Sequence, residues 1–331
     1  MSERSPRVRL HGPAAGEERL LAREVIQWVF YLPFDNREIH LDVEDALEVY
    51  RRGVGVSPQT ICRVNHPDPD GEVEYSLLEE EGWQIIRDWM RPSTRWRFLD
   101  EFDEDDWFAK RRVKFGCEFR IFIAGPYTEP TGHSFLYKPR VPWREPSRDY
   151  SSVLRATVST EFLEKRGPQQ VRDLAMEMAE RLPFSTGHAG LAMDFTWVRR
   201  TLVPQLKEAL FRHPGIHVDN PLTEWFLGSQ VEGVHWLNFL GPQVLGAVGG
   251  VKALRSQLHA PGTTVQEMAG GRALVTLGPW PEAGDLSRGD TLPAYRELAR
   301  VLEPWLQPVH LPPWPGYTEE EYRRWWRRFL D

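Results

Sequence analysis

Short apolar runs separated by turn-forming residues dominate the pattern of this chain. The run from Arg23 to Leu32 is β-branched and aromatic with one polar interruption, which predicts a largely buried strand. Asp42 is placed to cap a short helix that carries its apolar residues on one face. Ser76 and Glu79 have the spacing of a capping box and predict a second helix, which runs to about residue 90. Further strands are predicted at residues 115–123, 134–137, 153–159, 189–196, 234–240 and 273–277.

Helical periodicity returns in the second half of the chain. Pro168 is placed to open a helix, Gly241-Pro242 precedes a helix that is interrupted at Gly249-Gly250, and residues 292–305 form another helix. Because strands and helices do not alternate strictly, the pattern favours an α+β fold with mixed or antiparallel sheets and packed helices. Its core is expected to contain Trp28, Phe119, Trp236 and Leu237.

The chain is predicted to consist of two similar-sized halves. Residues 138–150 contain three prolines and mark the boundary between them. The predicted parts are a loose lead-in at 1–19, an N-terminal α+β half at 20–140, a C-terminal α+β half at 150–310, and a terminal amphipathic helix at 316–331 that docks on the body.

Composition narrows the class of protein. The 331 residues are 41% hydrophobic and 27% charged, which is typical of a globular protein. Neither a signal region nor an apolar run of membrane-spanning length is present, so we expect a soluble cytoplasmic protein with no membrane partner. Cys62 and Cys117 are isolated, and we expect both to be buried free thiols. The net charge of −7 argues against direct binding of nucleic acid.

No local motif assembles a catalytic, cofactor or metal site. His213 and His217 have the spacing of a helical metal pair, but Pro214 and Gly215 between them would break the helix. Residues 183–187 resemble a nucleophile elbow but have Pro in place of the first Gly, so we interpret them as a turn before a strand. The sequence therefore predicts no catalytic residue, no cofactor and no metal ligand.

The densest local signal is a run of six acids in seven positions with aromatic residues interleaved. Its members are Asp100, Glu101, Phe102, Asp103, Glu104, Asp105, Asp106 and Trp107. Like charges repel, so this run is a solvated surface, a protein interface or a calcium or magnesium site. It lacks the glycine and the alternate spacing of an EF-hand loop, which disfavours the metal site. The basic residues Arg91, Arg95, Arg97, Lys110, Arg111 and Arg112 lie close enough in sequence to neutralise it.

The second half of the chain carries an ordered set of motifs. The set is Gly187-His188-Ala189-Gly190-Leu191-Ala192, then Val234-His235-Trp236-Leu237-Asn238-Phe239-Leu240-Gly241, then Gly249-Gly250, and then Gly289-Asp290 leading to Pro293-Ala294-Tyr295. This ordered set resembles the type VI immunity family, whose namesakes protect against VRR-type nuclease effectors. The resemblance covers roughly residues 20–310 and is strongest from 185 to 305.

The resemblance implies a non-catalytic cytoplasmic protein that binds a cognate toxin and blocks it. It carries over no binding residue, because the recurring positions have a structural character. The acidic run 100–107 is the candidate surface, since a basic nuclease groove attracts carboxylates. Two alternatives stay open: an enzyme with His188 or His235 as acid–base group, and a scaffold that oligomerises through its aromatic residues. The sequence does not fix the toxin or the oligomeric state.

Overall fold

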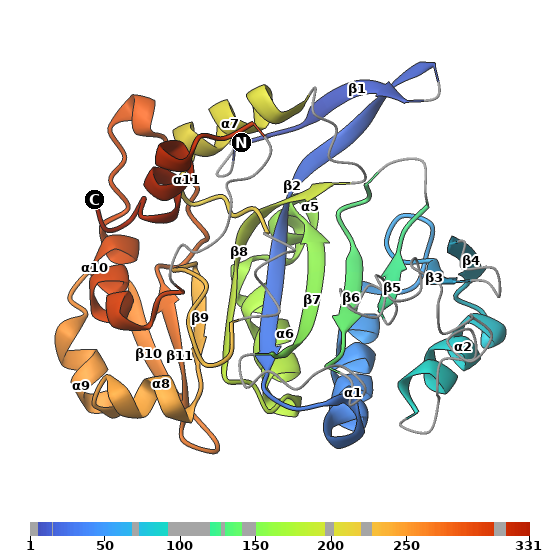
Figure 1. Ribbon diagram of the computed structural model, residues 1–331, viewed down its shortest axis with the longest axis horizontal. Coiled ribbons are helices and arrows are strands. Elements are labelled where there is room, and N and C mark those ends of the chain that lie inside the picture. The colour runs from blue at the N-terminus through green and yellow to red at the C-terminus, as the bar shows by residue number, and fades with distance from the viewer. Residues whose placement is uncertain are drawn as a thin grey trace, which may run out of the picture.

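The computed structural model describes residues 6–14, 16–67, 73–91, 120–126, 130–140, 150–195, 202–219, 227–307 and 316–331. These residues form one antiparallel sheet of eleven strands with helices packed against it (Figure 1). The predicted α+β class is confirmed.

The sheet has the order β10-β11-β9-β8-β2-β7-β6-β5-β3-β4, and β1 pairs separately with β2. Strand β2 therefore lies near the middle, between β8 and β7 (Figure 1). The strands are β1 Leu10–Ala14, β2 Glu17–Leu32, β3 Arg63–Pro67, β4 Val73–Leu77, β5 Ile121–Ala124, β6 Ser134–Lys138, β7 Ser152–Ser159, β8 Thr186–Phe195, β9 Leu237–Leu240, β10 Thr263–Met268 and β11 Arg272–Leu277.

Helices α1 and α6 pack on one face of the central strands, whereas α8, α9 and α10 gather at the β10 end (Figure 1). The helices are α1 Asn36–Val54, α2 Glu80–Met90, α5 Thr160–Arg166, α6 Pro168–Arg181, α7 Val203–Arg212, α8 Pro242–Ala247, α9 Gly250–Gln257, α10 Pro293–Leu302 and α11 Glu319–Trp326.

Strand β2 is buried on both faces from Leu21 onward, which explains why its second half, Val25 to Leu32, is apolar except for Gln27. Trp28 and Phe30 belong to the core that also contains α1 and α6. Val29 and Tyr31 point to the opposite face, where they pack with Leu227. The expected burial of Trp28, Trp236 and Leu237 is confirmed, while Phe119 lies outside the described residues.

The expected loose lead-in at 1–19 is wrong for part of its length. Residues 10–14 form β1, and β2 begins at Glu17, so the two strands make an antiparallel hairpin. Residues 10–14 read Leu-His-Gly-Pro-Ala, which gives no strand-like alternation to detect. Backbone pairing with a neighbouring strand orders this segment without requiring an apolar face.

Two predicted helix starts are also corrected. Helix α1 begins at Asn36, because Asp35 and Glu38 form the capping box, and Asp42 lies inside the helix. Helix α2 begins at Glu80 without a side-chain cap. Ser76 is instead paired within strand β4, so its backbone is extended.

Strand pairing crosses the predicted boundary between the halves. Strand β2 from the first predicted half pairs with both β7 and β8 of the second. The sequence pattern also missed strands β3, β4 and β10 and helices α5 and α7. Within the described ranges, no helix is long and apolar enough to cross a membrane. Cys62 is a free thiol but is partly exposed rather than buried, and Cys117 lies outside the described residues.

The turn before α8 requires a glycine. A Cβ atom at Gly241 would lie 2.2 Å from the carbonyl oxygen of Ser185, and that oxygen accepts a 2.9 Å hydrogen bond from the Gly241 amide. Gly246 lies within α8 itself, and a Cβ atom at Gly246 would meet nothing within 4 Å.

We therefore expect Gly241→Ala to lower the free energy of unfolding by about 1–3 kcal/mol or more, because backbone must move to relieve the clash. Gly246→Ala is the matched control and should be neutral or stabilising by up to about 1 kcal/mol, since Ala favours helix. Urea unfolding of both variants measures the difference. Equal stabilities of the two variants would contradict the packing described.

Candidate functional site

The predicted binding residues 100–107 lie outside the described residues, as do five of the six basic residues near them in sequence. Arg91 is described and exposed, and its guanidinium lies 3.2 Å from a carboxylate oxygen of Asp88. The acidic run therefore stays a candidate from sequence.

The described structure brings together three histidines that are distant in sequence. His188, His217 and His235 are between 2% and 4% exposed. Each offers one ring nitrogen such that these atoms all lie within 4.8 Å of one another. The rings of His188 and His235 are stacked with their centroids 3.8 Å apart, and His217 meets both rings edge-on. We refer to His188, His217 and His235 as the histidine cluster.

Strand pairing fixes two members of this cluster. His188 lies on β8 directly opposite Asn238 on β9. The Asn238 side chain accepts a 2.9 Å hydrogen bond from the His235 amide and donates one of 2.7 Å to the His235 carbonyl. Gly190 on β8 lies against His235, since a Cβ atom at Gly190 would lie 3.4 Å from the His235 Cβ atom.

The third member, His217, pairs farther along the edge of β8 that also pairs with β9, since β2 occupies the opposite edge. Its amide donates to the Leu191 carbonyl at 2.8 Å, and its carbonyl accepts from the Met193 amide at 3.0 Å. Helix α7 ends at Arg212, and the His213 ring lies 2.6 Å from the Gly284 carbonyl oxygen. The expectation that His213 and His217 do not share a helix face is confirmed.

Two carboxylates lie beside the histidine cluster. A Glu232 oxygen lies 3.6 Å from His188 Nε2, and its other oxygen lies 3.5 Å from His217 Nε2. Tyr31 donates its hydroxyl hydrogen to Glu232. Asp219 lies 3.6 Å from His217 Nε2 and pairs with Arg155 at 3.2 Å. The polar groups on this face of the sheet thus lie against one another rather than against water.

Burial decides the charge of these groups. Removal from water lowers the pKa of His188 to about 4 and the pKa of His235 well below its usual value, so both imidazoles are neutral at pH 7. Burial alone would raise the pKa of Glu232, but His217, His188 and the hydrogen bond from Tyr31 together outweigh burial, and the pKa is lowered. Glu232 is therefore a buried carboxylate in its ionised form.

The terminal helix and the residues after it close the cluster on one side. The Trp325 ring lies 6.0 Å from the His217 ring, and the Arg328 guanidinium lies 3.9 Å from the Trp325 ring centre. Arg328 also donates a 2.7 Å hydrogen bond to the Pro214 carbonyl. Closure of this kind suits a group of structural ligands better than a site that exchanges substrate with solvent.

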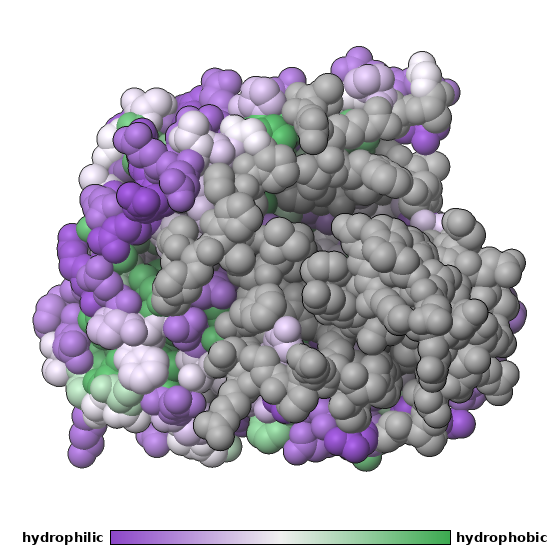
Figure 2. Space-filling view, in the orientation of Figure 1, coloured by the Kyte–Doolittle hydropathy of each residue, from purple (hydrophilic) through white to green (hydrophobic). Residues whose placement is uncertain are grey.

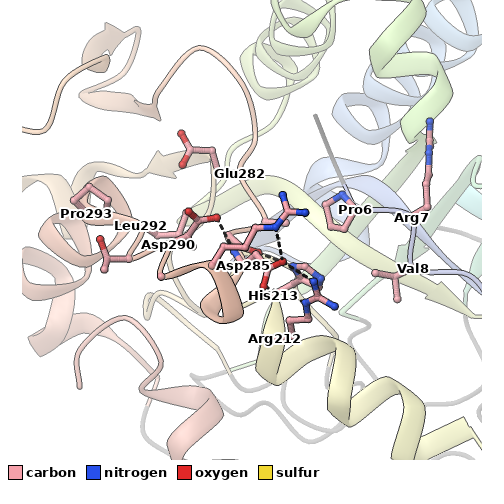
Figure 3. A pocket seen from close by; sticks show the side chains of 15 residues that line it. Pro6, Arg7, Val8, Arg212, His213, Glu282, Asp285, Asp290, Leu292 and Pro293 are labelled. Atoms are coloured by element: carbon pink, nitrogen blue, oxygen red, sulfur yellow. Dashed lines mark hydrogen bonds and ion pairs between the residues drawn. The ribbon is translucent and has the colours of Figure 1, made fainter. Parts of the chain in front are cut away.

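A separate open pocket of about 720 Å³ lies between the N-terminal segment and the loop before α10 (Figure 3). Asp285 is its central charged group. Arg212 donates to Asp285 at 2.7 and 3.0 Å, and with Ser287 it holds the pKa of that carboxyl well below its usual range. The Asp285 carboxylate is therefore already engaged by the protein within this pocket.

Aromatic residues in the described parts lie mainly in the core. The largest fully buried side chains include Trp28, Trp236 and Trp325. Figure 2 shows the face over α10 and α11 to be mostly hydrophilic, with small hydrophobic areas between. The exposed large apolar side chains are scattered: Leu41, Val56, Tyr75, Leu77 and Leu286.

Comparison with protein families decides the family. A model described as TsiV, type VI immunity for VRR-NUC, matches residues 114–329, which is more than half of the chain. The chain belongs to this family. The resemblance seen in the ordered motifs is confirmed, and the match begins later than the expected residue 20 and also includes α11. All three members of the histidine cluster fall inside the range matched by the TsiV family.

A solved structure supports the same fold. The Pseudomonas aeruginosa T6SS protein PA0821 superimposes with a TM-score of 0.73 at 17% identity, covering 97% of this chain and 87% of that chain. At this identity the likeness shows the fold alone. The search of curated proteins gives no match.

Two cluster histidines are embedded in the motifs that identified the TsiV family, yet their meeting was not predicted. His188 follows Gly187, and His235 precedes Trp236. The sequence indicates His188 and His235 only as alternative acid–base groups, and its spacing pairs His217 only with His213. No local spacing links positions 188, 217 and 235, since strand pairing and a return loop bring them together.

Arg328 offers a test of the closure. Arg328→Met keeps most of the apolar stem but leaves the Pro214 carbonyl without its charged donor. We expect a loss of about 1.5–3 kcal/mol in the free energy of unfolding. Arg327→Met, which removes surface ion pairs with Asp331 and Glu303, is the control and should cost no more than about 1 kcal/mol. Chemical denaturation distinguishes them, and an equal effect would show that Arg328 is not a structural contact.

Proposed function

We propose that this protein neutralises a cognate type VI effector nuclease by binding it, without catalysing a reaction. The family match over residues 114–329 carries the proposal. The burial of the histidine cluster supports it, because imidazoles that are 2–4% exposed present no surface to a substrate. An inhibitor of this kind acts in stoichiometric amounts.

The acidic run 100–107 is the proposed contact surface. A nuclease carries a basic groove for phosphates, and six carboxylates close together give a stronger local potential than a net charge of −7 spread over 331 residues. Phe102 and Trp107 would supply apolar anchors, since rim charges mainly affect the rate of encounter. The run would then compete with nucleic acid for the groove.

The first test separates binding from catalysis. Purified protein is titrated against a fixed amount of each candidate VRR-NUC effector nuclease, and cleavage of plasmid DNA is measured. We expect cleavage to fall in proportion to added protein and to stop near equimolar amounts. Complete loss of nuclease activity at a small molar fraction would instead mean that the protein modifies the effector, and would overturn the proposal. An unrelated nuclease of similar charge is the control and should keep its activity.

The second test addresses the contact surface. Asp103→Asn, Glu104→Gln, Asp105→Asn and Asp106→Asn are combined, and association with the effector is followed at several salt concentrations. Loss of four carboxylates should slow association on the order of tenfold or more at low salt and weaken its salt dependence, with little change in dissociation.

A second variant carries the same change of charge elsewhere on the surface, at Glu18, Asp45, Glu208 and Glu267, which are exposed. It should associate nearly as fast as the unchanged protein if position matters more than net charge. Circular dichroism verifies folding of both variants. Equal rates for the two variants would refute residues 100–107 as the contact surface while leaving the inhibition test unaffected.

A further inference from the structure

The histidine cluster has unused bonding capacity. Among the described residues, none forms a hydrogen bond with the Nε2 atom of His188, His217 or His235. Buried polar atoms in proteins are normally satisfied, because an unpaired one costs on the order of 1–3 kcal/mol. Three unsatisfied nitrogens that converge on one point are therefore an observation that needs a ligand.

The spacing of these atoms excludes direct hydrogen bonds with the carboxylate beside them. Glu232 lies 3.6 Å from His188 Nε2 and 3.5 Å from His217 Nε2, beyond the roughly 2.7–3.2 Å of an N–H···O bond. A zinc ion with bonds of about 2.0–2.1 Å sets neighbouring tetrahedral ligands about 3.4 Å apart. The observed distances thus match the edges of a coordination polyhedron.

We propose that His188, His217 and His235, with Glu232 as the fourth ligand, bind one divalent transition-metal ion, with zinc as the best fit. Three imidazoles and one carboxylate are donors that zinc accepts in tetrahedral geometry. The ring nitrogens lie within 4.8 Å of one another, so side-chain movements of about 1 Å close the coordination sphere. Tyr31 donates to Glu232 and acts as an outer partner that orients the carboxylate.

The position of the site assigns it a structural role. Four protein ligands leave no coordination position for water or substrate, which is typical of structural zinc. The ligands come from β8, from the segment after α7, and from the segment between Leu227 and β9. One ion would therefore join three separate segments on the face of the sheet opposite α1 and α6. This inference does not depend on the proposed function.

The test uses the full chain without a histidine tag. Protein is unfolded in denaturant that contains a chelator, so that any metal is removed. It is then refolded with or without zinc chloride, and its metal content is measured by mass spectrometry. We expect about one zinc per chain and a higher melting temperature after refolding with zinc. Refolding with cobalt chloride should give the visible absorption bands of tetrahedral cobalt. Metal content below about a tenth of an equivalent, without cobalt bands, would overturn the proposal and identify a proton-linked histidine and carboxylate cluster.

Variants locate the site. Loss of an outer-shell partner already lowers metal affinity by about 10–100-fold, so His217→Gln and His235→Gln should each lower bound zinc at least about tenfold. His133→Gln is the matched control, since His133 is also buried, at 7% exposure, but lies outside the cluster. It should keep the full metal content. Equal loss in the control would reject this site, and the cobalt spectrum of the unchanged protein decides the question if a cluster variant does not fold.

Discussion

The burial of β2 on both faces is the constraint on which the rest of this structure depends. A central strand with Trp28 and Phe30 on one side and Val29 and Tyr31 on the other needs cover on both sides. Helices α1 and α6 supply an apolar layer on the first side. On the second side, the cover is formed by irregular segments that begin after α7 and continue to β9. Irregular backbone brings polar groups with it, and these must find partners.

On the second face, these polar groups find their partners within a polar layer. Gln27 and Arg155 both engage Asp219 from neighbouring strands, and Tyr31 engages Glu232. The histidine cluster then occupies the space between these carboxylates and the terminal helix. Such a layer is costly unless every member is satisfied. A bound metal ion would satisfy the Nε2 atoms of the three histidines at once, and it would do so without opening a route for substrate.

A closed interior fits the proposed role of binding an effector. The histidine cluster is buried, and the Asp285 carboxylate in the open pocket is engaged by Arg212. Families of inhibitors can keep such a scaffold while their contact surfaces vary, because loops tolerate change better than packed strands. The acidic run 100–107, the proposed contact surface, lies in sequence between α2 and β5.

The sequence by itself determined the elements whose signals are local. Strand patterns, caps and left-handed glycines act over a few residues, so the sequence predicts the elements that depend on them. These are the apolar run of β2, the opening of α6 at Pro168, the break at Gly249-Gly250 and the terminal helix α11. The ordered glycine and aromatic motifs also identified the family. Much of the α+β class was thus predictable without coordinates.

Only the tertiary structure decided where the two predicted halves meet and which polar residues share a site. The pairing of β2 with β7 and β8 rests on backbone hydrogen bonds between distant segments, which side-chain patterns do not encode. His188, His217 and His235 converge because β8 pairs with β9 at His188 and with the returning segment after α7 at Ala192. A cluster assembled by long-range pairing has no sequence spacing of its own, so it becomes visible only when the chain is folded.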